Sequence, residues 1–361
     1  MTTLNVAIVG CGRIADLHAL GYRERKDTRI AAVCDIKRKP ARTKAREWEV
    51  DKVYSDYSKL LSDPEIHLVE LLVPHHLHAE MTIAACQAGK HVSVQKPMAL
   101  SVAEADRMIT AAEQAGVVLR VYENFVFYPP YVYAKQMIES GDIGEPQMLR
   151  IHVGTGKSKT EWKVPISAWL WRFKDEKESG GVLTFDHGYH LFSLAYYLLG
   201  EVERVYAWID HSPVGGLVPM SFASVDAPAT IMFQFKSPRR YGVMDFTHTP
   251  NMIMDSRFYS DDDRVEIIGD KGIIFINRCT ARTVDLPPLM LFRNGETLAI
   301  PVERTEWHES FIDCTRHLVV VLLKGGRPIL DGQAGKKVLQ FALAAQISAR
   351  EGRAVYIREV F

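Results

Sequence analysis

The clearest chemical signal is a glycine-rich run near the start of the chain. Gly10-Cys11-Gly12-Arg13-Ile14-Ala15 fits the pattern G-x-G-x-x-A and follows an apolar segment at Leu4–Val9. In this motif the first glycine permits a tight turn, the second lets a pyrophosphate approach the backbone, and the alanine permits close helix packing. The N–H groups that begin the next helix would bind the phosphates. The run predicts a dinucleotide site that includes Gly10, Gly12, Arg13 and Ile14.

An acidic residue at the end of the second expected strand supports this prediction. Asp35 comes 20 residues after Ala15, where a carboxylate would bind the hydroxyls of the adenosine ribose. Asp35 favours NAD, because the 2′-phosphate of NADP would meet a negative charge. Lys37, Arg38 and Lys39 follow at once. They either hold that phosphate, which leaves NADP open, or form an ordinary solvated helix start.

A lysine stands at the end of the fifth expected strand, in Gln95-Lys96-Pro97. Doubly wound sheets bind their ligands at the carboxyl ends of the strands. Packing explains a lysine there poorly, since lysine is rarely buried unpaired; a surface lysine at a strand end is the alternative. Pro97 would fix the local turn, and a cis bond before it is one way to do so.

A second glycine-rich run, from Gly180 to His190, contains an aspartate and histidines. Asp186 and His190 have i,i+4 spacing, so on a helix they share one face. A carboxylate beside an imidazole can fix its tautomer and raise its basicity. That arrangement suits a general base that takes a hydroxyl proton while hydride leaves. A structural histidine satisfied by an aspartate explains the pair equally well.

The first third of the chain alternates strand-like and helix-like segments. Apolar runs of strand length occur at Leu4–Val9, Ile30–Cys34, Ile66–Val73, His91–Val94 and Val117–Tyr122, with a short one at Val53–Tyr54. Helix-like segments occur at Arg13–Glu24, Arg38–Glu49, His78–Ala88 and Ala103–Ala115. This alternation indicates βαβ units and a parallel sheet. We predict an N-terminal Rossmann domain, a doubly wound α/β sheet, over residues 1–123.

The rest of the chain, residues 124–361, follows a different pattern and predicts an α+β domain. Period-two segments occur at Met148–Val153, Val202–Asp210, Ala229–Phe235, Tyr241–Thr247, Arg264–Ile268, Ile273–Asn277 and Leu289–Arg293. With the turn signals between them, they indicate one large, mostly antiparallel open sheet. Helices are expected at Tyr131–Ser140, Glu306–Leu323 and Gly335–Glu351, the last two free to pack back on the Rossmann domain. Ser212–Pro228, rich in Gly, Pro and Ser, is expected to be a long loop.

Bulk composition excludes several classes of function. Lysine plus arginine and aspartate plus glutamate both number 44 in 361 residues, so no basic surface for nucleic acid or membrane is indicated. Five cysteines without a CxxC pair are typical of reduced thiols. The N-terminal residues lack a signal-peptide pattern, and no apolar run reaches the ~18 residues of a membrane span. We expect a cytoplasmic protein.

Together these motifs resemble the glucose-fructose oxidoreductase / inositol dehydrogenase / rhizopine-catabolism family, Gfo/Idh/MocA, over essentially the whole chain. Pro74-His75-His76-Leu77-His78 looks like the segment after the family's fourth strand, and the Gly180–His190 run looks like its third motif. Gln95-Lys96-Pro97 looks like its Glu-Lys-Pro motif, with glutamine in place of the usual glutamate. Further matches are Glu123-Asn124-Phe125, Trp171-Arg172 and Glu351-Gly352-Arg353.

The resemblance implies roles for individual residues. Lys96, Asp186 and His190 would form the catalytic set, with His190 as the base and Lys96 holding the reacting hydroxyl and orienting the nicotinamide. The cofactor would also contact Pro74, His75, His78, Gln95 and Asn124. The open sheet would join subunits into a dimer or tetramer.

Further side chains are candidates for the substrate site. These are Tyr122, Trp171, Arg172 and His187, in addition to the catalytic set. Packing in the sheet domain is the alternative for the two aromatic residues and Arg172, and capping or packing is the alternative for His187. The clusters His75/His76/His78 and His187/His190 also raise the question of a metal. A structural or cofactor-adjacent role explains them better, and we expect no metal.

Three functions fit these observations. The first is a dehydrogenase that acts on a secondary alcohol of a sugar, glycoside or cyclitol with NAD or NADP. The second is an enzyme that retains its cofactor and achieves net hydrolysis, elimination or epimerisation. The third is a non-catalytic regulator that senses NAD(P). The intact set Lys96, Asp186 and His190 favours an enzyme, and we predict the dehydrogenase.

Overall fold

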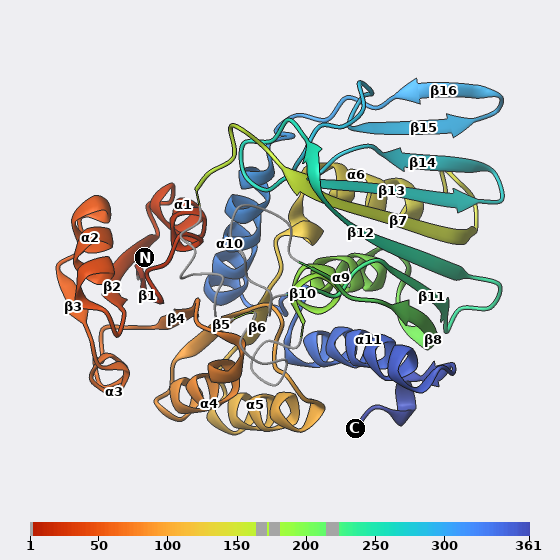
Figure 1. The fold of residues 1–361 in the computed structure, drawn as a ribbon. Helices are drawn as coiled ribbons and strands as arrows, with labels where there is room; N and C mark the ends of the chain where they lie inside the picture. The colour runs from red at the N-terminus through yellow and green to blue at the C-terminus, as the bar shows by residue number, and fades with distance from the viewer. Residues whose placement is uncertain (1–2, 164–171, 173–180, 214–223) are drawn as a thin grey trace. The chain divides into compact units, whose positions relative to one another are not determined.

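A computed structural model describes residues 3–163, 172, 181–213 and 224–361 (Figure 1). Trp171, predicted to line the substrate site, lies outside the described residues, as does most of the expected loop Ser212–Pro228. At the ends of that loop two short strands, β9 (Ser212–Pro213) and β10 (Ser224–Val225), pair with each other. Among the described helices, none combines the length and apolar character needed to cross a bilayer.

Contacts between residues divide the chain into two units. The first contains the described residues up to Asn124 together with Phe311–Leu339. The second contains the described residues from Phe125 to Ser310 together with Gln340–Phe361. Two long helices, α10 (Trp307–Lys324) and α11 (Gly332–Glu351), each contribute residues to both units.

The first unit contains the predicted Rossmann sheet. Its described strands are β1 (Leu4–Val9), β2 (Thr28–Cys34), β3 (Lys52–Tyr54), β4 (Leu68–Leu71), β5 (His91–Gln95) and β6 (Leu119–Tyr122). Their order is β3-β2-β1-β4-β5-β6, and every pair is parallel. This order places the switch point between β1 and β4, where doubly wound folds bind dinucleotides.

Helices cover this sheet nearly as predicted. They are α1 (Ala15–Arg23), α2 (Arg38–Trp48), α3 (Tyr57–Leu61), α4 (His78–Gln87) and α5 (Val102–Ala115). Ser101 and Glu104 form a capping box at the start of α5. Helix α3 was not predicted, because five residues are too few to show a helical period; Asp56 caps it through the backbone N–H groups of Ser58 and Lys59.

The segment of α10 in the first unit packs against α1 and the sheet. Leu318 and Val319 belong to the same apolar cluster as Val6 and Ile8. Gly21 permits the close approach of α1, since a Cβ there would lie 2.5 Å from the Cβ of Thr315. This packing holds α1, which follows the glycine-rich run, against its strand.

The second unit contains the predicted large sheet, whose described strands run in the order β16-β15-β14-β13-β7-β12-β11-β8-β17. They are β7 (Pro146–Lys157), β8 (Val202–Ile209), β11 (Ala229–Phe235), β12 (Tyr241–Ile253), β13 (Asp261–Gly269), β14 (Gly272–Ile276), β15 (Leu289–Arg293), β16 (Glu296–Ala299) and β17 (Val355–Tyr356). Among these pairs only β7 with β12 is parallel, so the sheet is mostly antiparallel as predicted. Strand β16 was not predicted, because all of its residues are exposed and show no alternation.

Burial alternates along the central strands of this sheet, so one face is buried and the other is open. Helices α6 (Pro129–Glu139), α9 (Gly188–Leu199) and the second half of α11 cover the buried face (Figure 1). The ring of Phe341 from α11, for example, lies 4.9 Å from that of Phe233 and 4.6 Å from that of Phe192, between centroids. Helix α9 is therefore packed against the buried face of the large sheet.

Candidate functional site

The glycine-rich run forms the turn that the sequence predicts. Gly10 has φ +95°, and a side chain there would collide with the carbonyl oxygen of Leu72, so only glycine fits. At Gly12 an added Cβ would meet no atom within 4 Å. The open space beside the Gly12 backbone, at the start of α1, fits the approach of a pyrophosphate.

Two backbone N–H groups fix the carboxylate of Asp35 beside the glycine-rich run. Its Oδ2 accepts a hydrogen bond of 2.9 Å from the backbone N–H of Cys11, inside the glycine-rich run. Its Oδ1 accepts one of 2.8 Å from the N–H of Lys37. Next to it, Ile36 is 88% exposed, which is unusual for an apolar side chain. It offers a surface for an adenine ring that the sequence analysis did not identify.

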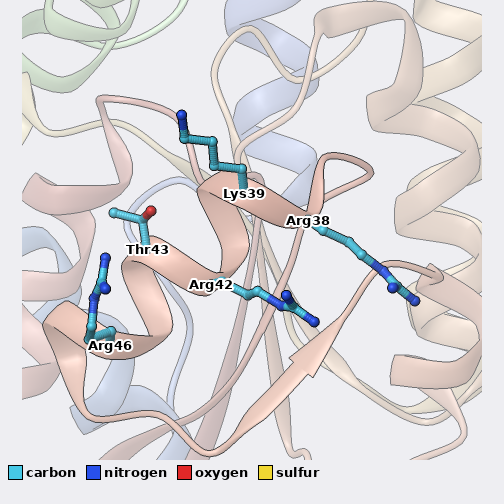
Figure 2. A pocket seen from close by; sticks show the side chains of 5 residues that line it. All are labelled: Arg38, Lys39, Arg42, Thr43 and Arg46. Atoms are coloured by element: carbon cyan, nitrogen blue, oxygen red, sulfur yellow. The ribbon is translucent and has the colours of Figure 1, made fainter.

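A basic groove runs along α2, directly after Asp35. It is lined by Arg38, Lys39, Arg42, Thr43 and Arg46 (Figure 2). Figure 2 shows the side chains of Arg38 and Arg42 extending to the same side of the helix. Arg38 and Lys39 lie in the first turn of α2, which contains no acidic residue and where the helix dipole also favours an anion.

The two histidines expected to contact the cofactor after β4 are both buried. His78 has no exposed surface, and its ring nitrogens lie 2.8 Å from the carbonyl oxygen of Pro97 and 2.9 Å from that of Val73. It thus joins the ends of β4 and β5. This geometry fits a bracing role for His78 better than direct contact with a nucleotide. His75 lies beside it, with ring centroids 5.6 Å apart.

Lys96 follows β5 and precedes a cis peptide bond to Pro97. Its backbone N–H donates a 2.8 Å hydrogen bond to Oε1 of Gln95. The amide nitrogen of Gln95 lies 2.9 Å from Nε2 of His18, on α1. The turn that carries the lysine is therefore tied to the helix that follows the glycine-rich run.

Tyr122 requires a correction, because the structure does not support its predicted contact with substrate. Its ring has no exposed surface, and its hydroxyl donates a 2.9 Å hydrogen bond to the carbonyl oxygen of Phe311. The residue was chosen for its place at the end of β6. Side chains alternate between the two faces of a strand, and this one points into the core beside α10.

The third motif does not begin as an α-helix. Val182–His187 form a π-helical turn, η4, which leads into α9. Asp186 therefore lies in the π turn and His190 in the first turn of α9, so the face that they share is not that of one continuous α-helix. Asp186 forms an ion pair with Arg172, in which Nε and Oδ2 are 2.5 Å apart.

Stacking fixes the plane of the His190 imidazole. Its ring lies nearly parallel to that of Phe125, with centroids 4.2 Å apart and an interplanar angle of 11°. The residue is 9% exposed, which leaves a small accessible edge. A ring held in this way can exchange a proton in a fixed direction.

The start of this helix depends on a residue that the sequence analysis did not identify. Oδ1 of Asp226 accepts hydrogen bonds from the backbone N–H groups of Val182 (3.0 Å) and Leu183 (2.6 Å). Its Oδ2 accepts one from the N–H of Thr184 (2.8 Å) and another from the Thr184 hydroxyl. A single carboxylate satisfies three N–H groups of a helix start, which positions the turn that carries Asp186.

His187 lies between two carboxylates of β13. Its Nε2 is 3.4 Å from Oδ1 of Asp263, and its Nδ1 is 3.7 Å from Oδ2 of Asp261. One potential ligand atom from each of the three residues lies within 4.8 Å of the others. The group could hold a cation, although the sequence led us to expect no metal. The aspartates are more than 70 residues away along the chain, so sequence spacing could not place them beside His187.

The predicted site residues divide between the two units. The first unit carries Gly10, Gly12, Arg13, Ile14, Asp35, Pro74, His75, His78, Gln95, Lys96 and Asn124. The second carries Arg172, Asp186, His187 and His190.

Comparisons with known proteins match both units. A family model described as "Oxidoreductase family, NAD-binding Rossmann fold" matches residues 4–123, and one described as "GFO/IDH/MocA C-terminal domain" matches residues 131–275. A myo-inositol 2-dehydrogenase from Thermotoga maritima is 30% identical over 358 residues, which cover 99% of each chain. A 2,7-anhydro-N-acetylneuraminate hydratase from Mediterraneibacter gnavus is 29% identical over 282 residues, or 77% of this chain and 68% of that protein.

The fold also matches solved structures. One is a levoglucosan dehydrogenase in complex with NADH and levoglucosan, with a TM-score of 0.81 and 25% identity. The match covers 99% of this chain and 100% of that one.

Removing the Asp226 cap tests its role in this site. Asp226→Ala leaves the N–H groups of residues 182–184 without their acceptor, so we expect a loss of about 1–2 kcal/mol of stability. Amide hydrogen exchange at these residues should speed up, while exchange in β1 to β6 should not change. The matched control is Asp285→Asn, at a side chain that is 92% exposed. Unchanged protection at residues 182–184 would contradict the capping role.

Proposed function

Because the chain belongs to the Gfo/Idh/MocA family of oxidoreductases, we propose that it transfers hydride between a secondary alcohol and the nicotinamide of NAD(P). The alcohol belongs to a sugar, a glycoside or a cyclitol, the classes to which myo-inositol and levoglucosan belong. The observation that carries the proposal is the nucleotide site, where Asp35 is tied to the glycine-rich run through the N–H of Cys11.

The catalytic roles go to Lys96, His190 and Asp186. NAD, when bound, supplies the hydride acceptor at C4 of the nicotinamide. His190, held flat against Phe125, takes the proton of the substrate hydroxyl. Lys96 donates a hydrogen bond to the same oxygen and stabilises the negative charge that develops there. As the O–H bond breaks, its electron pair forms the second C–O bond, and the hydrogen on that carbon leaves with the C–H electron pair as hydride for the nicotinamide.

Asp186 and its neighbours set the surroundings of His190. The ion pair with Arg172 fixes the Asp186 carboxylate, which in our proposal orients the imidazole of His190. Arg172 and His187 are the described candidates for contacts with the remaining hydroxyls of the substrate. Both carry donors suited to a polyol.

The absorbance of reduced nicotinamide tests this function directly. Purified protein with NAD or NADP should give a rise in this absorbance with one group in a panel of sugars, glycosides, sugar acids and cyclitols.

Lys96→Ala should lose about 10²–10³-fold in turnover while still binding the cofactor, because it removes a donor to the developing alkoxide. His190→Asn should abolish the acid limb of the pH–rate profile, because that limb reports protonation of the base. Unchanged turnover in Lys96→Ala would refute the assignment.

A second function is favoured by one comparison. The hydratase relative carries out a reaction whose name implies no net oxidation. An enzyme of that kind holds its cofactor and returns the hydride to its substrate. It would consume substrate without a rise in reduced nicotinamide, and product analysis by NMR in the same assay separates the two functions.

The cofactor is NAD, and the basic groove of α2 governs whether NADP is also accepted. Asp35 binds the two ribose hydroxyls, and Arg38 at the helix start is the nearest of the groove cations along the chain. Arg38→Ala should lower kcat/KM for NADP relative to NAD, since a cation close to the 2′-phosphate is lost. The control is Arg46→Ala, two helical turns further along the same groove. Equal preference in Arg38→Ala and the wild type would leave Asp35 as the determinant.

The proposal also includes the cellular location and the oligomeric state of the protein. Its five cysteines are all free and buried, as is usual in a reducing compartment, which supports a cytoplasmic location. The open face of the large sheet supports a homo-oligomer. Trp208 is 57% exposed there, with Tyr206 beside it at 4.8 Å between ring centroids, and Met232 on the neighbouring strand pairs with Tyr206.

This apolar face gives a test of assembly. Trp208→Glu should shift the protein to monomer in sedimentation velocity, because a buried charge opposes association. Leu286→Glu is the control, since Leu286 is also about half exposed but lies outside the sheet. A monomeric wild type would contradict the proposed oligomer.

A further inference from the structure

A network of hydrogen-bonded polar side chains is buried in the first unit, and it leads to the turn that carries Lys96. Its centre is Glu70 of β4, which has no exposed surface. Oε1 of Glu70 lies 2.8 Å from Nδ1 of His18 and accepts a 3.1 Å hydrogen bond from the Ser93 hydroxyl. Oε2 accepts a 2.6 Å hydrogen bond from the hydroxyl of Tyr22, and Nη2 of Arg120 lies 3.9 Å away.

The surroundings determine which of these groups are charged. Burial raises the pKa of Glu70, but the hydrogen bond from His18 and the charge on Arg120 outweigh it and leave that pKa below its ordinary value. Burial also lowers the pKa of His18, despite the opposing effect of Glu70. The hydrogen bonds assign the protons: Gln95 accepts from the Lys96 N–H and so turns its NH2 group toward Nε2 of His18, which must be an acceptor. His18 is then a neutral imidazole, and Glu70, which receives donors at both oxygens, is an anion.

A neutral imidazole has one N–H and one acceptor nitrogen, so the direction of each hydrogen bond follows. The Nδ1–H of His18 donates to Glu70, which leaves Nε2 as an acceptor. The amide N–H of Gln95 donates to Nε2 over 2.9 Å. The amide oxygen of Gln95 then faces the backbone N–H of Lys96 and accepts from it over 2.8 Å.

This polarity explains why glutamine, and not glutamate, suits position 95 of this chain. A glutamate carboxylate has no N–H to donate, so it would set two acceptors against each other at the Nε2 of His18. The conflict is removed when the group takes up one more proton, either on His18, which becomes a cation between two carboxylates, or on a carboxyl group, whose O–H can then donate. Glutamine satisfies both neighbours without adding a buried charge.

We infer that His18 and Gln95 are positioning residues, which hold the Lys96 backbone through the hydrogen-bond chain Glu70–His18–Gln95–Lys96. The inference rests on the proposed function for the catalytic role of Lys96. Packing keeps His18 in place, since its ring lies 3.8 Å from that of Tyr122 and 5.4 Å from that of Phe311, between centroids. Displacing a reacting group by about 1 Å can cost 10²-fold in rate, so the support of this backbone matters.

The groups around His18 come from five elements. They are Tyr22 of α1, Glu70 of β4, Ser93 and Gln95 of β5, Arg120 and Tyr122 of β6, and Phe311 and Cys314 of α10. Glu70 favours the charged imidazole, whereas burial and Arg120 oppose it. Replacing Gln95 with glutamate adds a second anion and reverses this balance.

Nitrogen NMR of the histidine side chains tests this hydrogen-bond network without any assay of activity. In the wild type, His18 should be the neutral Nδ1–H tautomer, with a pKa below the ordinary value of a histidine. In Gln95→Glu its pKa should rise relative to the wild type, so that the doubly protonated ring persists to higher pH. His18→Asn assigns the signal by removing it. A wild-type His18 that carries its proton on Nε2, or whose pKa does not rise in Gln95→Glu, overturns the inference.

Kinetics tests the consequence for Lys96. Gln95→Glu should lower kcat by about 10- to 100-fold with little change in KM for NAD. The residual activity should fall as pH rises through the raised pKa of His18, because the ring then stops donating to the introduced carboxylate. Gln95→Met interrupts the hydrogen-bond network without adding a charge. It should lower kcat and add no new limb to the pH–rate profile. Gln114→Glu, the same substitution on the exposed side of α5, is the control.

The NMR and kinetic experiments together distinguish a failure of this inference from a failure of the proposed function. Wild-type kcat and pH profile in both position-95 variants would overturn the positioning role. A wild type that reduces no nicotinamide with any substrate would refute the proposed function. The NMR arm would still decide the direction of the hydrogen bonds at His18, in the wild type and in either variant that folds.

Discussion

The carboxylate of Glu70 imposes the constraint on which the first unit depends. A fully buried charge is costly unless other groups satisfy it, and removing one partner of such a pair costs about 3–5 kcal/mol. Its partners come from different elements: His18 and Tyr22 from α1, Ser93 from β5 and Arg120 from β6. Satisfying this single charge therefore fixes α1, the helix that follows the glycine-rich run, relative to β5, the strand that precedes Lys96. Arg120 extends the network to α10 through the carbonyl oxygen of Cys314, 2.7 Å away.

In the second unit, another carboxylate satisfies polar groups that would otherwise lack a partner. A helix start leaves backbone N–H groups without partners, and Asp226 satisfies those of residues 182–184. The turn so fixed leads to Asp186, which pairs with Arg172, and to His190, which stacks on Phe125. In both units a carboxylate outside the proposed catalytic set helps to hold the backbone of a residue that we assign to it.

The sequence predicted what depends on local patterns and missed what depends on distant contacts. The glycine-rich run, Asp35 and the strands of the Rossmann sheet follow from spacing and periodicity within about 35 residues. Asp226 could not be found, because it acts on residues more than 40 positions earlier and its own surroundings read as loop. Glu70 did leave a signal, a carboxylate inside the apolar run Ile66–Val73, but the run was interpreted only as a strand. Tyr122 was a candidate for the substrate site, but it is fully buried; its place near the end of a strand did not by itself tell which face its side chain takes.

The glutamine at position 95 shows how far a departure from a family pattern can be explained physically. Considered alone, it removes a charge beside Lys96. Considered with His18, it is the neutral donor that a neutral imidazole requires, and the two positions form one unit. With glutamate at position 95, the same pair would need one more proton, on the imidazole of His18 or on a carboxyl group. Burial lowers the pKa of the His18 imidazole, and the charge on Arg120 acts in the same direction, against the effect of Glu70. In our inference the residue at position 95 therefore follows from the burial and the charges around His18.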